Sequence, residues 1–159
     1  MFFYKFTNGA RRVLSRANQA AHSRNNERIG TEHILQGLAE EESGKAFQAL
    51  KNLNISLENI VHAINKVTRM ECETMPSKTI KLPQTRRARR VVKNAIAESR
   101  KYKSRIVGTE HMLLGLLNIP ESSAVRVLES MGFTSDQVRQ EVFNLHASID
   151  KSLNRISGL

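Results

Sequence analysis

The sequence is poor in the residues that mark several common classes of protein. Its 159 residues include one cysteine, three prolines, eight glycines, eight phenylalanines and tyrosines together, and no tryptophan. The single cysteine, Cys72, excludes an internal disulfide and fits a reducing compartment. The scarcity of proline and glycine, beside plentiful alanine, leucine, arginine, glutamate and lysine, favours helices. We therefore expect a helical protein with a mainly aliphatic core.

Long apolar runs and nucleotide-binding loops are also missing. No stretch of about 18 apolar residues occurs, so we expect no membrane-spanning segment. The apolar residues 1–4 are too short for the hydrophobic part of a signal peptide. Neither Gly-x-x-x-x-Gly-Lys-Ser/Thr nor Gly-x-Gly-x-x-Gly is present, which argues against a self-contained ATPase. These absences predict a cytoplasmic protein without a membrane partner or a cofactor.

One short motif occurs twice and organises the chain. The tetrapeptide Gly-Thr-Glu-His recurs 78 residues apart, at Gly30-Thr31-Glu32-His33 and at Gly108-Thr109-Glu110-His111. The same offset, without a gap, aligns Thr7 with Thr85 and Leu50 with Leu128. Self-similarity at a fixed spacing is the signature of a repeat architecture. The chain is therefore expected to contain two units with the same design.

The apolar side chains of each unit recur at the spacing of one helical face. Ala10, Val13, Leu14 and Ala17 set this pattern in the first helix. We find no credible strand pattern and predict an all-α fold of eight helices, as two tandem pseudo-symmetric four-helix repeats. The expected helices cover about 8–23, 31 to a break at 40–44, 43–50, 57–67, 86–101, 109–117, 122–131 and 134–148.

The chain length fits one domain, residues 1–159, in which two short units share a core. We predict packing about a pseudo-two-fold axis, which would create paired, related surface sites. Within this domain the predicted parts are repeat one at 7–69, a proline-containing linker at 70–84, repeat two at 85–148 and a polar tail at 149–159.

The Gly-Thr-Glu motif has the composition of a helix start. In the first unit Gly30 permits a tight entry, the Thr31 hydroxyl can accept an unpaired backbone N–H, and the Glu32 carboxylate suits the positive end of the helix dipole. Such a terminus offers an acceptor for a guanidinium beside N–H donors for a phosphate. The plainer interpretation, a stable helix start and nothing more, stays open on this argument. The second unit repeats these ligand-binding candidates at Gly108, Thr109 and Glu110.

The histidines of the two motifs lack partners for metal or acid–base chemistry. His33 and His111 each follow a glutamate directly, and no cysteine or second histidine lies at ligand spacing. We interpret both as packed or hydrogen-bonded residues near a helix start, and we predict no metal site. Cys72 has no recognisable base nearby, and no catalytic constellation appears. The sequence therefore predicts a protein that is not an enzyme.

The net charge of +10 is concentrated in one segment. Residues 81–105 hold ten basic residues and a single acid, Glu98. Arg86 and Arg87 can contact phosphates of a nucleic acid. However, the apolar stripe of this helix leaves them on its outer face, and no aromatic side chains are interleaved with them. A nucleic acid is therefore the less favoured partner.

The aromatic residues are concentrated at the start of the chain. Phe2, Phe3 and Phe6 belong to an apolar arm that is expected to pack onto the body or onto a partner. Together with Arg86 and Arg87 they are candidates for partner docking.

The doubled motif and its surroundings resemble a known family, the Clp amino-terminal repeat domain. The resemblance is carried by Ile29-Gly-Thr-Glu-His-Ile-Leu-Gln-Gly-Leu38 and Val107-Gly-Thr-Glu-His-Met-Leu-Leu-Gly-Leu116. The opening, Phe6-Thr7 followed by Ala10-Arg-Arg-Val-Leu14, is also similar, and the likeness covers about residues 2–148. It is greatest to the front domain of ClpC-type AAA+ unfoldases.

The resemblance implies a fold of two four-helix repeats and a non-catalytic role. Domains of this family dock substrate and adaptor proteins and pass them to an ATPase ring that feeds the Clp protease. In ClpC-type domains the glutamates of the two motifs help to bind phosphorylated arginine, a degradation mark. The corresponding residues of this chain are Glu32 and Glu110.

Three functions remain as hypotheses. The first is a docking domain for arginine-phosphorylated or adaptor-delivered proteins, with its AAA+ ATPase modules in cis or in trans. The second is a stand-alone Clp-repeat adaptor or regulator of a Clp protease. The third is a basic nucleic-acid-binding protein, for which steeply salt-dependent binding is expected.

Overall fold

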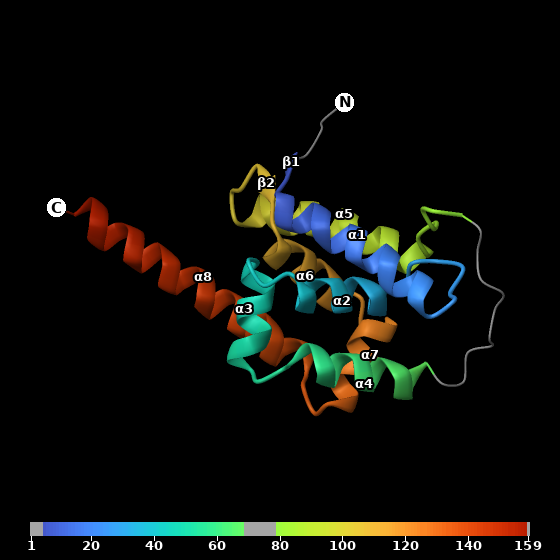
Figure 1. Ribbon diagram of the computed structural model, residues 1–159. Coiled ribbons are helices and arrows are strands. Elements are labelled where there is room, and N and C mark those ends of the chain that lie inside the picture. Colours follow the sequence, from blue (N-terminus) through green and yellow to red (C-terminus); the bar gives the residue numbers. More distant parts are fainter. Residues whose placement is uncertain (1–4, 69–78, 159) are drawn as a thin grey trace.

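A computed structural model describes residues 5–68 and 79–158. Eight helices form two four-helix repeats in this part of the chain, which confirms the all-α prediction (Figure 1). Phe2 and Phe3 of the apolar arm, and Cys72 of the linker, lie outside the described residues. The helices are α1 (Asn8–Ser23), α2 (Thr31–Glu40), α3 (Lys45–Asn52), α4 (Leu57–Val67), α5 (Arg86–Lys101), α6 (Thr109–Leu117), α7 (Ser123–Ser130) and α8 (Ser135–Ser157).

Several helices begin at a hydroxyl side chain that accepts a backbone N–H. Thr7 Oγ1 accepts from the N–H of Ala10 at 3.1 Å, and Thr85 Oγ1 accepts from that of Ala88 at the same distance. Ser56 caps α4 in the same way. A side-chain acceptor satisfies one of the donors that the first turn of a helix leaves unpaired. The sequence pattern therefore located these starts to within a residue or two.

The two repeats interlock through their second halves. Within each repeat the first two helices pack against each other, α1 on α2 and α5 on α6. In contrast, α3 packs against α8 and α4 packs against α7, so each of these pairs joins one repeat to the other (Figure 1). The 78-residue offset relates α3 to α7 and α4 to α8, so it exchanges the two pairs. The buried apolar side chains of both repeats consequently form one continuous core.

Close approach of the first two helices depends on glycine. A methyl group at Gly37 would lie 2.6 Å from the carbonyl oxygen of Val13, and one at Gly115 would lie 2.7 Å from that of Val91. These distances are too short for a carbon–oxygen contact, so the helices would have to separate. The glycine of each Leu-x-Gly-Leu or Leu-Gly-Leu segment is thus a packing residue.

Two short strands are an addition that the sequence pattern did not predict. Strand β1 (Lys5–Phe6) pairs in parallel with β2 (Ile106–Val107), with Phe6 opposite Val107. A matching single bridge joins Ile29 to Gln84, at the same 78-residue offset. Pairs this short show no alternation in sequence, and they form only when distant segments meet. In the first pair, the segment before α1 lies beside the segment before α6. In the second, the segment before α5 lies beside the segment before α2.

Helix α8 continues beyond the expected end near residue 148 and reaches Ser157. Its last turns project from the body of the protein, and Leu153 and Ile156 are exposed there (Figure 1). No proline or glycine occurs between Ser135 and Ser157, so nothing in the local sequence stops the helix. Among the described residues, no helix is both long and apolar enough to cross a membrane.

Candidate functional site

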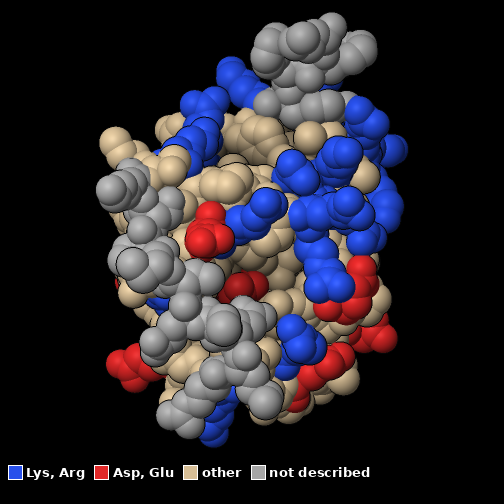
Figure 2. All heavy atoms as spheres, turned by 90° about the vertical axis from the view of Figure 1, so that its right-hand side faces the viewer, with Lys and Arg blue, Asp and Glu red and all other residues tan. Residues whose placement is uncertain are grey.

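The start of α2 lies in a pocket where three helix N-termini converge. This first pocket has a volume of about 500 Å³ and combines the starts of α2, α5 and α7. Figure 2 shows the face of the molecule on which these helices begin, with Lys and Arg side chains gathered around recessed acidic atoms. Helix N-termini present unpaired N–H groups and positive dipole ends, which favour an anion. Its lining residues are Gly30, Thr31, Glu32, Thr85, Arg86, Arg87 and Ser123.

A second, smaller pocket repeats this arrangement. It has a volume of about 210 Å³ and combines the starts of α6, α1 and α3. The 78-residue offset relates its parts to those of the first pocket, for example Thr7 to Thr85 and Lys45 to Ser123. Each pocket therefore contains residues of both repeats, and neither repeat alone can form one. The lining residues are Thr7, Gly9, Ser43, Gly44, Lys45, Gly108, Thr109 and Glu110.

The expectation that the threonines of the motif cap their own helices is wrong. The Thr31 hydroxyl accepts the N–H of Ala124 at the start of α7, at 3.2 Å. Symmetrically, the Thr109 hydroxyl accepts the N–H of Ala46 at the start of α3, also at 3.2 Å. The interlocked helices bring a donor of the other repeat to each hydroxyl. The buried threonines thus tie the two repeats together beneath the pockets.

The glycines of the motif provide space rather than an unusual backbone conformation. Gly30 has φ −98° and ψ 177°, which any residue can adopt. However, a methyl group on Gly30 would lie 2.5 Å from Oε2 of Glu32, and one on Gly108 would lie 2.5 Å from Oε2 of Glu110. Each glutamate folds its carboxylate back over the preceding glycine. The glycine therefore allows the carboxylate to occupy the mouth of the helix.

The carboxylate of Glu32 is buried and has no strong ionic partner. Glu32 is 8% exposed, and burial raises its pKa above the ordinary value. Its own backbone N–H, the charges of Arg24 and Arg126 and the Ser123 hydroxyl oppose this rise in pKa. No lysine or arginine of residues 5–68 and 79–158 lies within 4.0 Å of this carboxylate. A guanidinium entering the pocket would supply the missing partner.

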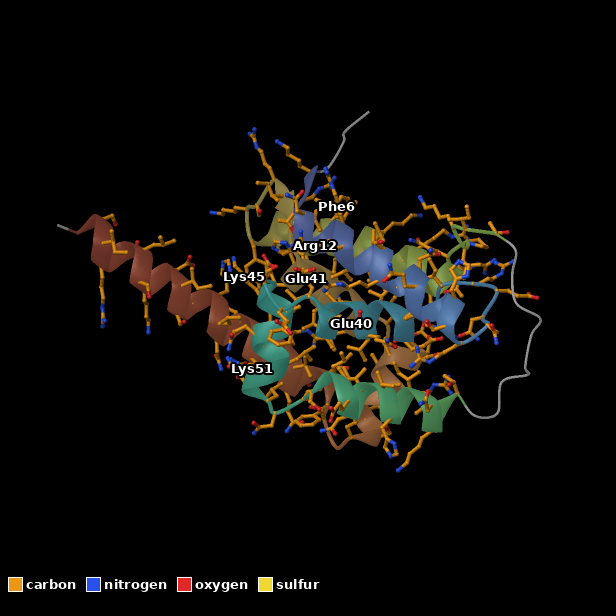
Figure 3. The ribbon with its side chains drawn as sticks, viewed as in Figure 1. Phe6, Arg12, Glu40, Glu41, Lys45 and Lys51 are labelled. Carbon is orange, nitrogen blue, oxygen red and sulfur yellow. The ribbon has the colours of Figure 1, made fainter. Side chains whose placement is uncertain are left out.

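The carboxylate of Glu110 has a partner within the chain. The Lys45 Nζ atom lies 3.8 Å from Oε1 of Glu110. Lys45 is the first residue of α3, and the preceding loop is held by Arg12, which binds the Glu41 carboxylate through two hydrogen bonds of 2.9 Å. Figure 3 shows Arg12 and Glu41 close together near the start of α3. The second pocket thus carries its own cation.

The two histidines hold the backbone of the motif. His33 Nδ1 accepts the N–H of Gly30 at 2.8 Å, and His111 Nδ1 accepts that of Gly108 at 3.0 Å. Burial, with a smaller effect of the Arg24 charge, lowers the pKa of His33 to about 4, so this ring is neutral near pH 7. The expected structural role of both histidines is confirmed. The described residues contain no group of three or more side chains suited to a metal.

Most of the predicted site residues meet in the two pockets. Arg86 and Arg87 line the first pocket with Glu32. Phe6 lines neither pocket; it is partly buried and packs against the core. Sequence reasoning missed Ser123 and Lys45 as pocket residues, since each comes from the repeat opposite the motif. The 78-residue alignment pairs these two positions with each other, but only the packing of the repeats places them in the pockets.

Comparison with known proteins decides the family. The sequence model of the Clp repeat (R) N-terminal domain matches residues 5–119 and again 84–158. The chain belongs to the Clp repeat N-terminal domain family. This Clp repeat domain is 38% identical over 148 residues to the negative regulator of genetic competence ClpC/MecB of Bacillus subtilis, covering 93% of this chain and 18% of that protein. It is 36% identical over 155 residues to the chaperone protein ClpB of Oceanobacillus iheyensis, covering 98% and 19%.

Solved structures show the same fold. The N-terminal domain of the caseinolytic protease associated chaperone ClpD of Arabidopsis thaliana superimposes with a TM-score of 0.75 at 24% identity, covering 91% of this chain and 96% of that one. The N-terminal domain of Hsp104 of Candida albicans gives 0.68 at 18% identity, with 91% and 93% covered. The Clp repeat domain spans less than a fifth of the length of the two curated relatives given above.

Proposed function

We propose that this Clp repeat domain docks proteins marked with phosphoarginine, or delivered by adaptors, for a Clp unfoldase. One observation supports the proposal above all others. A recessed glutamate carboxylate lies where three helix N-termini meet, and this arrangement occurs twice. A ligand that suits such a pocket carries a hydrogen-bond-donating cationic group and an anionic group a few ångströms apart.

Phosphoarginine has both groups on one side chain. Its guanidino N–H groups can donate to the carboxylate of Glu32 or Glu110, and its phosphoryl oxygens can accept from the backbone N–H groups of the helix starts. Arg86 and Arg87 add positive charge beside the first pocket. Unmodified arginine would leave the N–H donors without an anion. Phosphoserine would leave the buried carboxylate without a cation, so both are expected to bind poorly.

The role proposed for the whole protein follows from its relatives. The chain matches about a fifth of the ClpB and ClpC proteins of the comparison, at their Clp repeat domains. We propose that AAA+ ATPase modules act on the docked protein, in cis or in trans, and that this domain recognises its partners without catalysing a reaction. An adaptor or a marked substrate would then be the bound partner.

Calorimetric titration of free phosphoarginine into the protein tests the proposal. We expect binding of phosphoarginine and none of arginine or phosphoserine at the same concentrations. The double variant Glu32→Ala/Glu110→Ala should lose binding while retaining its helical circular dichroism spectrum. The matched control is Glu129→Ala, since Glu129 is an exposed glutamate of α7 outside both pockets. Binding that survives in the double variant would contradict the assignment of the site.

A further inference from the structure

The two pockets share a design but differ in their charged side chains. At the start of the repeat's first helix, Arg86 and Arg87 line the first pocket. The aligned residues are the uncharged Asn8 and Gly9, of which Gly9 lines the second pocket. At the start of the third helix, the first pocket has Ser123, whereas the second has Lys45. The pseudo-symmetry of the backbone is therefore not a symmetry of charge.

In the second pocket, the ammonium group of Lys45 is directed toward the carboxylate of Glu110. Lys45 Nζ is 3.8 Å from Oε1 of Glu110, the atom that a guanidino ligand would contact. An entering guanidino group must compete with this ammonium group. The second pocket is also the smaller one, about 210 Å³ against about 500 Å³. Both features disfavour a ligand there.

The first pocket has the opposite arrangement. Glu32 is only 8% exposed and lacks a lysine or arginine within 4.0 Å in the part of the chain that the structure describes. In this pocket the position of Lys45 is taken by Ser123, which is uncharged and cannot neutralise the Glu32 carboxylate. Meanwhile the exposed Arg86 and Arg87 line the wall at the start of α5. The Ser123 hydroxyl and the more distant charges of Arg24 and Arg126 act on this carboxylate, but no ammonium or guanidinium group of the described residues is in contact with it. A guanidino group can therefore contact it directly, while Arg86 and Arg87 attract the phosphoryl group.

We propose, resting on the proposed function, that the two pockets have unequal affinities for phosphoarginine and that Lys45 sets the difference. The pocket of Glu32 is the high-affinity site. In the pocket of Glu110, Lys45 acts as a built-in competitor for the guanidino position. A marked protein would therefore engage the first pocket first, and the second only at higher local concentration.

Two single-site variants isolate the pockets for titration with free phosphoarginine. Glu110→Ala leaves only the first pocket, and Glu32→Ala leaves only the second. We expect the first pocket to bind at least roughly tenfold more tightly, because it keeps the charge-assisted contacts and lacks the competitor. Thermal unfolding of each variant checks that the fold is intact.

Exchanging the residues at the paired positions tests the role of Lys45. In the Glu32→Ala background, Lys45→Ser should strengthen phosphoarginine binding roughly two- to fivefold, the range expected when a part-exposed ion pair is removed. In the Glu110→Ala background, Ser123→Lys should weaken binding by a similar factor. A weaker second pocket after Lys45→Ser would overturn the inference, because Lys45 would then be a phosphate ligand.

The outcomes separate the inference from the proposed function. Equal affinities that do not respond to the exchange would refute the inequality and leave phosphoarginine docking in place. An absence of binding to either pocket, in folded protein, would refute both.

Discussion

Glu32 and Glu110 owe their position to the glycine two residues before each of them, Gly30 and Gly108. Each carboxylate lies over a glycine where a methyl group would approach within 2.5 Å. A side chain at the glycine position would displace the carboxylate, because the end of the glutamate side chain can move more easily than the backbone. At the scale of single residues, the Gly-Thr-Glu motif is therefore a device for holding a carboxylate at the mouth of a helix.

Replacing this glycine should remove binding without unfolding the protein. We expect Gly30→Ala, in the Glu110→Ala background, to weaken phosphoarginine binding by roughly tenfold or more, because the carboxylate loses its place in a charge-assisted pair. Calorimetry measures the loss. Gly9→Ala is the control, since its methyl group would meet the nearest atoms at an ordinary 3.5 Å and lies in the other pocket. An unchanged affinity in Gly30→Ala would show that the glycine has no such role.

The buried His33 should make stability depend on pH. Its pKa is about 4 in the folded protein and about 6.5 when unfolded, so the unfolded chain binds the proton more tightly. The neutral ring's contribution is complete above pH 6.5 and is lost as the pH falls toward 4, by about 3 kcal/mol in all. Urea unfolding at pH 7, 5.5 and 4.5 measures this slope.

A conservative variant isolates the histidine. His33→Gln keeps an acceptor for the Gly30 N–H and does not titrate, so its free energy of unfolding should fall less between pH 7 and 4.5. His62→Gln, at an exposed position of α4, should leave the slope unchanged. Equal slopes in the wild type and His33→Gln would rule out His33 as the source.

At the scale of elements, the helices are joined at their ends as well as along their faces. The hydroxyls of Thr31 and Thr109 each accept a backbone N–H from the third helix of the other repeat. The parallel bridges between lead-in segments add a second set of such links. These polar contacts set the position of three helix starts relative to one another, and hence the shape of each pocket.

Removing one of these hydroxyls should destabilise the protein. Thr31→Val preserves the shape but leaves the buried N–H of Ala124 without its acceptor, at a cost of about 1–3 kcal/mol. Thr31→Ser keeps the hydroxyl and should be closer to the wild type. Chemical denaturation of both variants measures the difference. If valine and serine were equally tolerated, the contact would contribute nothing to stability.

At the scale of the whole molecule, the two repeats are parts of one structure. Helices α3 and α4 pack against α8 and α7 of the other repeat, and the apolar core runs through both. A unit of about 70 residues has little core of its own. The pockets likewise need both repeats, so the proposed binding sites form only in the interlocked arrangement.

A single repeat should therefore fail to fold. We expect a fragment of residues 1–69 to show weak helical circular dichroism and no cooperative thermal transition, because α3 and α4 lose their packing partners. The full chain should unfold in one transition under the same conditions. A cooperative transition of the fragment near that of the full chain would contradict the interlocked description.

The sequence by itself determined the local part of this structure. Apolar spacing and caps such as Thr7 and Thr85 located the helices, because helix formation depends on neighbours three or four residues apart. The doubled motif identified the repeat, the family and both glutamates. The structure differs from the sequence prediction in the longer α8 and in the two-residue strands. At these places the sequence has no helix-stop residue and no strand alternation to indicate the structure.

The tertiary structure alone decided what surrounds each glutamate. Thr31 meets Ala124 and Lys45 meets Glu110 across 93 and 65 residues of chain, and no local pattern reports such distances. The motif therefore predicts two equivalent sites. The packing of the opposite repeat, however, places the Lys45 ammonium group beside Glu110. It places two arginines, Arg86 and Arg87, in the pocket of Glu32. Local periodicity specifies elements, but the chemistry of a pocket depends on which distant side chains the fold brings to it.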